Sequence, residues 1–114
     1  MLKKSKRLRA EEVAQVMKTG RSMRSAHLQV KFAPAGTMLR AAAVVPKSLA
    51  RKATLRNALR RALYRVLAAA NTAQISGHAV FFVRGLPKEK LAATFAQELA
   101  SLLPSLAATV HKTR

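Results

Sequence analysis

Residues 47–65 read KSLARKATLRNALRRALYR, and the rest of the chain can be interpreted from this stretch. From residue 55 onward, apolar side chains recur at the spacing of one face of an α-helix: Leu55, Leu59, Ala62, Leu63, Val66 and Leu67. The opposite face carries basic, amide and phenolic side chains: Arg56, Asn57, Arg60, Arg61, Tyr64 and Arg65. Arginines four positions apart lie above one another on a helix, so these arginines form two short ridges of positive charge.

The crowding of positive charge on this predicted helix has two possible explanations. Each pair of like charges at this spacing costs roughly a few tenths of a kcal/mol in an isolated helix, and no acidic residue lies between Glu12 and Glu89. The arginines could simply form a solvated face that aids solubility. However, the chain has a net charge of +18 and only two other acids, Glu11 and Glu98. A compact chain with this charge repels itself, which favours a polyanionic partner, and a basic helix of this kind is typical of nucleic-acid binding.

Length and composition exclude several classes of protein. A chain of 114 residues has room for one domain with one core, and its half share of apolar residues is typical of a globular protein. There is no cysteine, which excludes disulfides and thiolate sites. No apolar stretch follows the basic start as in a signal peptide, and no run reaches the roughly 20 apolar residues of a membrane span. We therefore expect a cytoplasmic protein without a membrane partner.

The first half of the chain predicts a basic arm, a helix and two strands. Residues 1–9 form the arm, which is either a flexible solubilising tail or a direct RNA contact. A helix is predicted over residues 10–19, with acidic residues in its first turn, Gly20 as its stop and Val13, Val16 and Met17 as its apolar stripe.

Residues 21–25 are interpreted as a basic connection before the first predicted strand. Residues 27–33, HLQVKFA, alternate as a half-buried strand does, with Leu28, Val30 and Phe32 on one face. Residues 34–36 predict a turn, and residues 38–45 predict a second strand that ends before Pro46.

The second half of the chain predicts one more strand and one more helix after the arginine-rich helix. A polar loop over residues 71–77 precedes a buried strand at residues 78–83, HAVFFV. A helix is predicted from Pro87 to about Leu103, and residues 104–114 form a basic tail. The expected fold is α+β, a layered α-β sandwich in which residues 10–103 form a single domain.

No set of residues predicts catalysis or metal binding by the polypeptide. His27, His78 and His111 are scattered and lack carboxylates at metal-ligand spacing. Glu11 and Glu12 are adjacent, so they point in different directions on a helix and cannot act as an acid and base pair across one bond. We expect no catalytic residues, no bound metal and no cofactor in the polypeptide itself.

The order of these parts resembles the protein component of bacterial ribonuclease P over roughly residues 6–103. The family's signature is an Arg-Asn-Arg box followed by Lys-Arg and a further arginine on one helix. Arg56 and Asn57 match the first two box positions, and Arg60 and Arg61 match the basic pair that follows. The third box position is Ala58, which departs from the pattern.

The resemblance implies a fold and a role. The fold would be a two-layer α-β sandwich with a four-stranded sheet and a left-handed βαβ crossover through the arginine helix, like that of the second domain of ribosomal protein S5. The protein would be a subunit of a ribonucleoprotein endoribonuclease that removes the 5′ leader of precursor tRNA. Its partners would be the catalytic RNA, which would hold the Mg²⁺ ions, and precursor tRNA. The polypeptide is expected to be monomeric.

The resemblance and the charge pattern together give two sets of candidate site residues. The first would bind phosphates of the catalytic RNA: Lys47, Arg51, Lys52, Arg56, Asn57, Arg60, Arg61 and Arg65. The second would form a cleft for the single-stranded leader: Arg7, Arg9, Val13, Met17 and Phe32. An ordinary core role is the alternative for the three apolar members of the second set.

Two other functional classes compete with this interpretation. A structural RNA-binding protein, such as a ribosomal protein of similar fold, would share the charge without assisting an RNA enzyme. A DNA-binding or membrane-surface module could also use a basic amphipathic helix. No second helix joined by a tight turn precedes the arginine-rich helix, so the sequence disfavours this last class.

Overall fold

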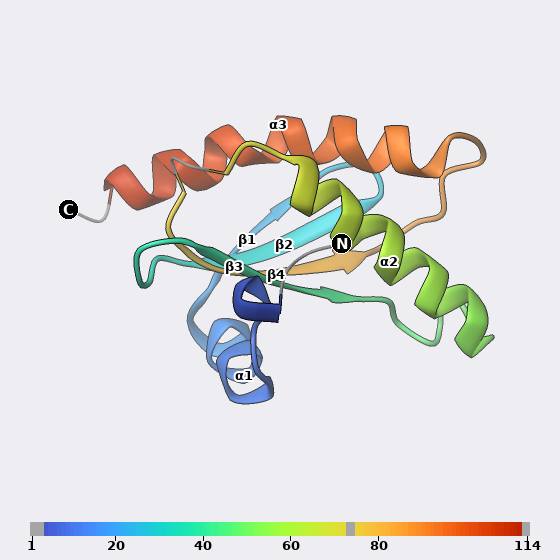
Figure 1. Cartoon of the computed structure of the whole chain (residues 1–114), viewed down its shortest axis with the longest axis horizontal. Helices are drawn as coiled ribbons and strands as arrows, with labels where there is room; N and C mark the ends of the chain where they lie inside the picture. The colour runs from blue at the N-terminus through green and yellow to red at the C-terminus, as the bar shows by residue number, and fades with distance from the viewer. Residues whose placement is uncertain (1–3, 73–74, 113–114) are drawn as a thin grey trace.

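The structure, a computed structural model, describes residues 4–72 and 75–112, without the side chains of residues 108–112. Its elements follow in order along the chain: η1 (Lys4–Lys6), α1 (Ala10–Thr19), β1 (Arg21–Arg24), β2 (Leu28–Ala33), β3 (Leu39–Val44), α2 (Ala53–Ala69), β4 (Gly77–Val83) and α3 (Leu91–Lys112). Figure 1 shows α2 and α3 over one face of the sheet and α1 against the other. The predicted α+β class and the α-β sandwich are confirmed.

The four strands form a single mixed sheet in the order β1-β2-β4-β3. β2 pairs antiparallel with β1 and with β4, whereas β3 pairs parallel with β4. Parallel neighbours need a long crossover connection, and α2 provides it. The arginine-rich helix is therefore the crossover of a βαβ unit, as the resemblance implies. The left-handed sense of this crossover and the likeness to ribosomal protein S5 stay predictions.

The main core lies between the sheet and the layer formed by α2 and α3. The predicted inward face of β2, Leu28, Val30 and Phe32, is completely buried. The helices supply leucine and phenylalanine side chains at helical spacing: Leu59, Leu63, Leu67, Phe95, Leu99, Leu102 and Leu106. A smaller cluster of Val16, Val80 and Phe82 holds α1 on the other face of the sheet.

The first helix has the bounds that the sequence predicts. The backbone amide of Arg9 donates to Glu12 Oε1 at 2.8 Å, which satisfies one donor at the helix start. Gly20 ends the helix with φ −71°, outside the left-handed region. A Cβ atom at Gly20 would lie 2.6 Å from the carbonyl oxygen of Val16. Glycine is needed here because the backbone passes close to the last turn.

The structure corrects the interpretation of residues 21–25 as a connection. Arg21–Arg24 form β1, an edge strand whose register pairs Arg21 with Phe32 and Arg24 with Gln29. Three of its four side chains are exposed and only Met23 packs toward the core, so the strand lacks the apolar alternation that reveals a half-buried strand.

The structure also corrects both ends of the last helix. The helix begins at Leu91 rather than Pro87, directly after Lys90, whose φ is 51°. It also continues through Pro104 instead of ending near Leu103, so the backbone of the predicted tail is helical as far as Lys112. Proline removes a backbone donor from a helix, but Leu106 is completely buried beyond it. Core packing on both sides of the proline keeps the helix continuous.

Residues 4–9, assigned to the predicted arm, lie against the outer edge of β3. Arg7 forms a parallel bridge with Ala41, and the amide of Leu8 donates to the carbonyl oxygen of Ala41 at 3.0 Å. This segment therefore extends the hydrogen bonding of the sheet beyond its last strand.

Candidate nucleic-acid interface

The packing of α2 determines which of its side chains face solvent. Leu59, Leu63 and Leu67 are buried against the sheet and α3. The predicted phosphate-binding residues that are exposed lie on the helix and in the loop before it: Lys47, Arg51, Lys52, Asn57, Arg60, Arg61 and Arg65. The structure thus brings the first predicted set together, with one exception.

The exception is Arg56, which is half-buried and turned toward the protein backbone. Its guanidinium donates to the carbonyl oxygens of Ala50, at 3.0 Å, and Arg51, at 2.7 Å. Arg56 therefore fastens the loop that precedes α2, and one of the two predicted arginine ridges is incomplete. The Arg60 guanidinium instead donates to the side-chain oxygen of Asn57.

No glutamate neutralises the arginines of α2. In the described parts of the chain, the ion pairs join Glu98 to His27, and Glu12 to Arg40 and His78. All of these pairs lie outside α2. Exposed guanidinium groups without a carboxylate partner keep their full charge for an external anion, and their planar donors suit phosphate.

A hollow of about 420 Å³ lies beside these arginines and is lined by Arg7, Ala43, Asn57, Arg60, Arg61 and Tyr64. Tyr64 ties α2 to the sheet, since its hydroxyl accepts a hydrogen bond from the backbone amide of Ala43 at 3.1 Å. The guanidinium carbon of Arg7 lies 5.0 Å from the centre of the Tyr64 ring, which is cation–π distance. Sequence reasoning assigned Tyr64 to the polar face without a role. The sequence feature that could have indicated a role for Tyr64 is that it is the only aromatic residue among the arginines of this helix.

The predicted leader cleft is divided by the structure. Val13 is half-buried and packs against the smaller core cluster under α1. The side chain of Met17, on the same helix, is 41% exposed. Phe32 is completely buried on the opposite face of the sheet, toward α2 and α3. The assignment of Phe32 to the cleft is therefore wrong, because neighbouring positions of a strand face opposite sides and Phe32 points to the core side.

The aromatic residue on the α1 side of the sheet is Phe82, which sequence reasoning missed. The guanidinium carbon of Arg84 lies 4.9 Å from the centre of its ring, and Arg84 Nε donates to Gln29 Oε1 at 2.7 Å. Lys31 on the adjacent strand reaches the carbonyl oxygen of Met17 at 3.5 Å. The sequence feature that could have revealed Phe82 is the Phe81-Phe82 pair in β4, because side chains of successive strand residues face opposite sides of the sheet and one of the two must face α1.

The two arginines predicted for the cleft are separated as well: Arg9 is the N-cap residue of α1 and its carbonyl oxygen accepts from the amide of Val13 at 2.9 Å, whereas Arg7 pairs with Ala41 of β3. Arg7 lines the hollow beside α2 and also, with Arg9, a second basic hollow of about 710 Å³. Lys4, Ser5, Leu8 and Arg40 complete the lining of that second hollow.

Two histidines contact glutamates and so have structural partners. Glu98 accepts from the backbone amide of His27 at 2.6 Å, and its other oxygen lies 2.6 Å from His27 Nδ1. Burial alone would raise the pKa of Glu98, but hydrogen bonds from the Ser25 hydroxyl and from His27 lower it below its ordinary value.

No group of three or more potential ligands capable of holding a metal ion occurs among residues 4–72 and 75–112.

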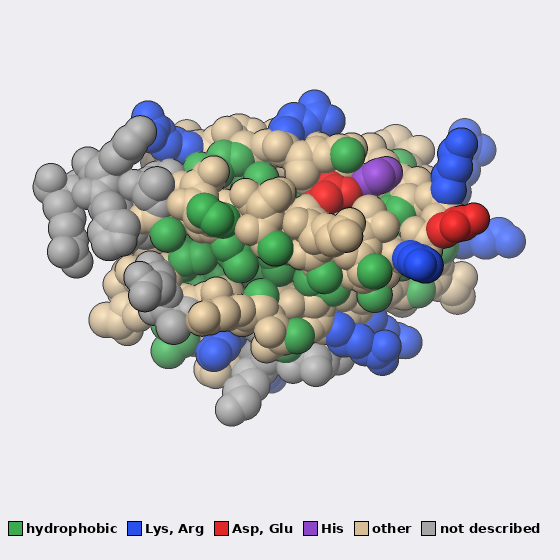
Figure 2. All heavy atoms as spheres, turned by 90° about the horizontal axis from the view of Figure 1, so that it is seen from above, with side chains coloured by type: hydrophobic (Ala, Val, Ile, Leu, Met, Phe, Trp, Pro, Cys, Tyr) green, Lys and Arg blue, Asp and Glu red, His purple; other side chains and the backbone are tan. Residues whose placement is uncertain are grey.

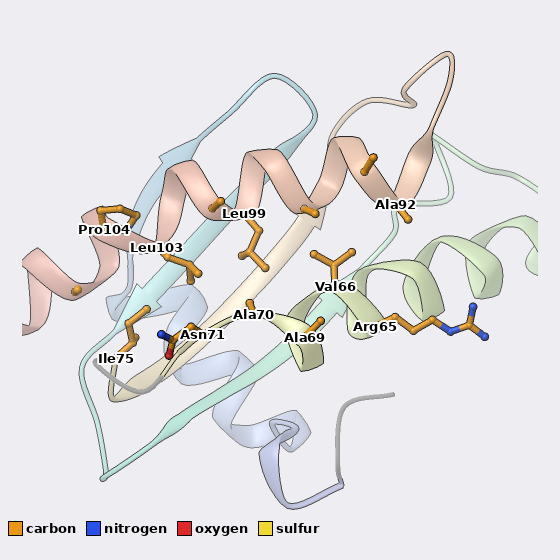
Figure 3. Close-up of a pocket in the computed structure, with 14 residues that line it drawn as sticks. Arg65, Val66, Ala69, Ala70, Asn71, Ile75, Ala92, Leu99, Leu103 and Pro104 are labelled. Carbon is orange, nitrogen blue, oxygen red and sulfur yellow. The ribbon is translucent and has the colours of Figure 1, made fainter.

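The space-filling view from the α2 and α3 side shows hydrophobic side chains gathered near the middle of this face and Lys and Arg around its margins (Figure 2). A groove of about 750 Å³ lies here, between the C-terminal half of α2 and α3, and Arg65 is the only charged residue among the described residues that line it. In Figure 3 the Arg65 side chain extends away from the groove. This groove lacks the charge to bind a polyanion.

In the described parts of the chain, no helix is long and apolar enough to cross a bilayer.

Comparisons with known proteins identify a family and solved structures that resemble this chain. The family model described as Ribonuclease P matches residues 2–107, whereas no curated protein matches the chain. The ribonuclease P protein from Thermotoga maritima is 25% identical, with a TM-score of 0.74 over 87% of this chain and 96% of that protein. A Staphylococcus aureus ribonuclease P protein mutant with defective mRNA degradation activity has 20% identity and a TM-score of 0.75, over 90% of this chain and 88% of that protein, which supports the fold alone. Because the family model spans nearly the whole chain, this protein belongs to the Ribonuclease P family.

Proposed function

We propose that this chain, as the protein subunit of ribonuclease P, binds the catalytic RNA through α2 and its preceding loop and binds the 5′ leader of precursor tRNA on the α1 side of the sheet. The observation that carries the proposal is the exposure of Asn57, Arg60 and Arg61 beside a hollow without a carboxylate. Family membership makes the chain part of a tRNA-processing ribonucleoprotein.

The chemistry of the α2 face suits an RNA backbone. Guanidinium groups form paired hydrogen bonds with phosphate and do not distinguish one base from another. Structured RNA is recognised mostly through its shape and backbone, because side chains cannot read its narrow major groove. The face would therefore fix the position of the catalytic RNA with little sequence preference.

The α1 side of the sheet suits a single strand. Proteins hold single strands with a basic track and with aromatic platforms, each worth roughly 1–3 kcal/mol per stacked base. Lys31 and Arg84 provide positive charge there, and Phe82 provides one ring. Phe82 is only 7% exposed, so stacking would contribute less here than in a cleft with several open rings.

The protein's contribution to cleavage would be electrostatic and positional. The Mg²⁺ ions at the scissile phosphate would be held by the RNA, and the protein's cations would reduce repulsion between the two RNAs. Divalent ions and bound cations both neutralise phosphates. The complex should therefore need less Mg²⁺ when the protein is present.

Reconstitution tests this proposal. A transcribed bacterial ribonuclease P RNA is assayed on precursor tRNA over a Mg²⁺ titration, with and without the protein. We expect the protein to shift the Mg²⁺ requirement downward, and to do so more for a substrate with a leader of several nucleotides than for one with a single leader nucleotide. RNA binding without any shift would instead favour a structural RNA-binding protein of similar fold.

A further inference from the structure

Arg40 on β3 contacts three separate points of the N-terminal part of the chain. Its terminal nitrogens donate to the carbonyl oxygen of Arg7, at 2.8 Å, and to Glu12 Oε2, while Nε donates to the carbonyl oxygen of Ser5 at 3.3 Å. All three guanidinium nitrogens are thus engaged with residues 5–12. A side chain used in this way holds a segment in place.

Glu12 completes the connection from the helix side. One carboxylate oxygen accepts from the backbone amide of Arg9 at 2.8 Å, and the other binds Arg40 and lies 3.8 Å from His78 Nε2. The Arg9 amide and then Arg40 hold the pKa of Glu12 below its ordinary value. Arg40 and Glu12 therefore fix the backbone on both sides of Arg7 and Leu8.

The held segment carries Arg7 to the arginines of α2. Arg7 lies over the ring of Tyr64 and lines the same hollow as Asn57, Arg60 and Arg61, about 50 residues further along the chain. Its place there depends on the path of residues 5–9 along β3. This path is set by the Ala41 hydrogen bond and by the contacts of Arg40.

We propose that the pair Arg40–Glu12 positions Arg7 as a phosphate-binding member of the α2 hollow, an inference that rests on the proposed function. Arg7 then belongs to the surface that binds the catalytic RNA rather than to the leader cleft. Two other roles are possible for the pair. Arg40 could itself bind phosphate, or the pair could only stabilise the fold, and each makes a different prediction.

The sign of a charge change distinguishes these roles. Glu12→Gln removes a negative charge, so it would strengthen RNA binding if charge alone mattered or if Glu12 only competed with phosphate for Arg40. If the pair positions Arg7, the same variant weakens binding. Glu11→Gln is the matched control, because Glu11 is the exposed neighbour in the same helical turn and the net charge changes equally.

The experiment measures binding of a transcribed ribonuclease P RNA over a salt series, at a temperature where circular dichroism shows every variant folded. We expect Glu12→Gln to weaken binding by about tenfold, the value of one charge-assisted contact. It should also reduce the log–log salt slope by roughly 0.7–0.9, or one phosphate contact. Glu11→Gln should not weaken binding. Equal behaviour of the two variants would overturn the proposal.

A cycle with Arg7 separates positioning from fold stability and from direct contact. Arg7→Gln should produce the same loss, and adding Glu12→Gln should produce no further loss, since both changes remove one contact. Additive losses would contradict the positioning role. Arg40→Lys keeps the charge but cannot make all three contacts, so it should behave like Glu12→Gln, and wild-type binding by this variant would also contradict the proposal. If Arg60→Gln with Arg61→Gln leaves RNA binding unchanged, the proposed function itself fails.

Discussion

Replacement of Glu98 by alanine should destabilise the protein more than any comparable change of a surface glutamate. Glu98 projects from α3 to the start of β2, where its carboxylate accepts hydrogen bonds from the backbone amides of His27, at 2.6 Å, and Leu28, at 3.1 Å. It also binds the Ser25 hydroxyl and the His27 ring. One side chain, 12% exposed, therefore fastens α3 to the sheet.

The magnitude follows from the donors that would lose their acceptor. A buried donor without a partner costs about 1–3 kcal/mol, and water can reach part of this site, so each of the two backbone amides should cost near the lower limit. The hydroxyl and the imidazole can turn toward solvent and add little. The free energy of unfolding should fall by about 2–3 kcal/mol, which lowers the melting temperature of a chain of this size by about 8–12 °C.

Thermal unfolding followed by circular dichroism at pH 7 measures this effect, with Glu89→Ala as the control. Glu89 is exposed just before α3, and its loss changes the net charge by the same amount. The control should shift the melting temperature by no more than about 2 °C, because surface changes are usually within about 0.5 kcal/mol. Equal shifts for both variants would refute the reasoning.

The pH dependence gives a second test of the same site. The pKa of Glu98 is lowered in the folded state from its ordinary value of 4.5, so its charged form is stabilised by folding. This stability is complete above pH 4.5 and disappears as the pH falls through the folded-state pKa. The difference in stability between wild type and Glu98→Gln should therefore narrow as the pH falls below about 4.5. An equally large difference at pH 3 would show that the charge of the carboxylate is unimportant.

Three predictions concern the proposed RNA-binding surfaces. Replacing both Arg60 and Arg61 by glutamine should reduce the log–log salt slope of RNA binding by roughly 1.4–1.8. When salt is raised from about 50 to about 200 mM, the affinity of this variant should therefore fall by a factor roughly ten times smaller than that of wild type. An unchanged slope in a folded variant would show that this face does not bind RNA. Phe82→Ala should weaken binding of precursor tRNA up to about fivefold, since a mostly buried ring offers only part of a stacking platform, and the loss should vanish for tRNA without a leader. Phe32→Leu should lower the melting temperature and leave leader binding unchanged, and the opposite pattern would restore Phe32 to the cleft.

The parts of the fold that the sequence predicted correctly are those with strong local periodicity. β2 alternates strictly, and its inward residues are the ones that are buried. α1 has acidic residues at its start and a glycine after its end, and its observed bounds are those predicted. In both cases the signal lies within about ten neighbouring residues, so no knowledge of tertiary contacts was needed.

The errors occurred where a distant element decides the outcome. Which face of the sheet lies toward α1 cannot be determined from β2 or β4 alone, so the cleft ring was assigned to Phe32 instead of Phe82. Arg56 fits the basic face by its spacing, but the carbonyl groups of the preceding loop draw it inward. A proline such as Pro104 normally ends a helix, but Leu102 and Leu106 on either side of it are buried in the core, and this packing could not be read from the local sequence.

The positions of the four glutamates explain how so basic a chain can fold without internal ion pairs that neutralise the arginines of α2. Glu12 and Glu98 are the two whose carboxylates contact other elements, and each serves as a hydrogen-bond acceptor for backbone amides as well as an ion-pair partner. They connect α1 to β3 and α3 to β2, and neither contacts an arginine of α2. Two acids cannot balance 22 basic residues, but they can fix the elements on either side of the crossover helix. With α2 held by its neighbours, its arginines are free of any internal counterion, and an RNA backbone can supply one.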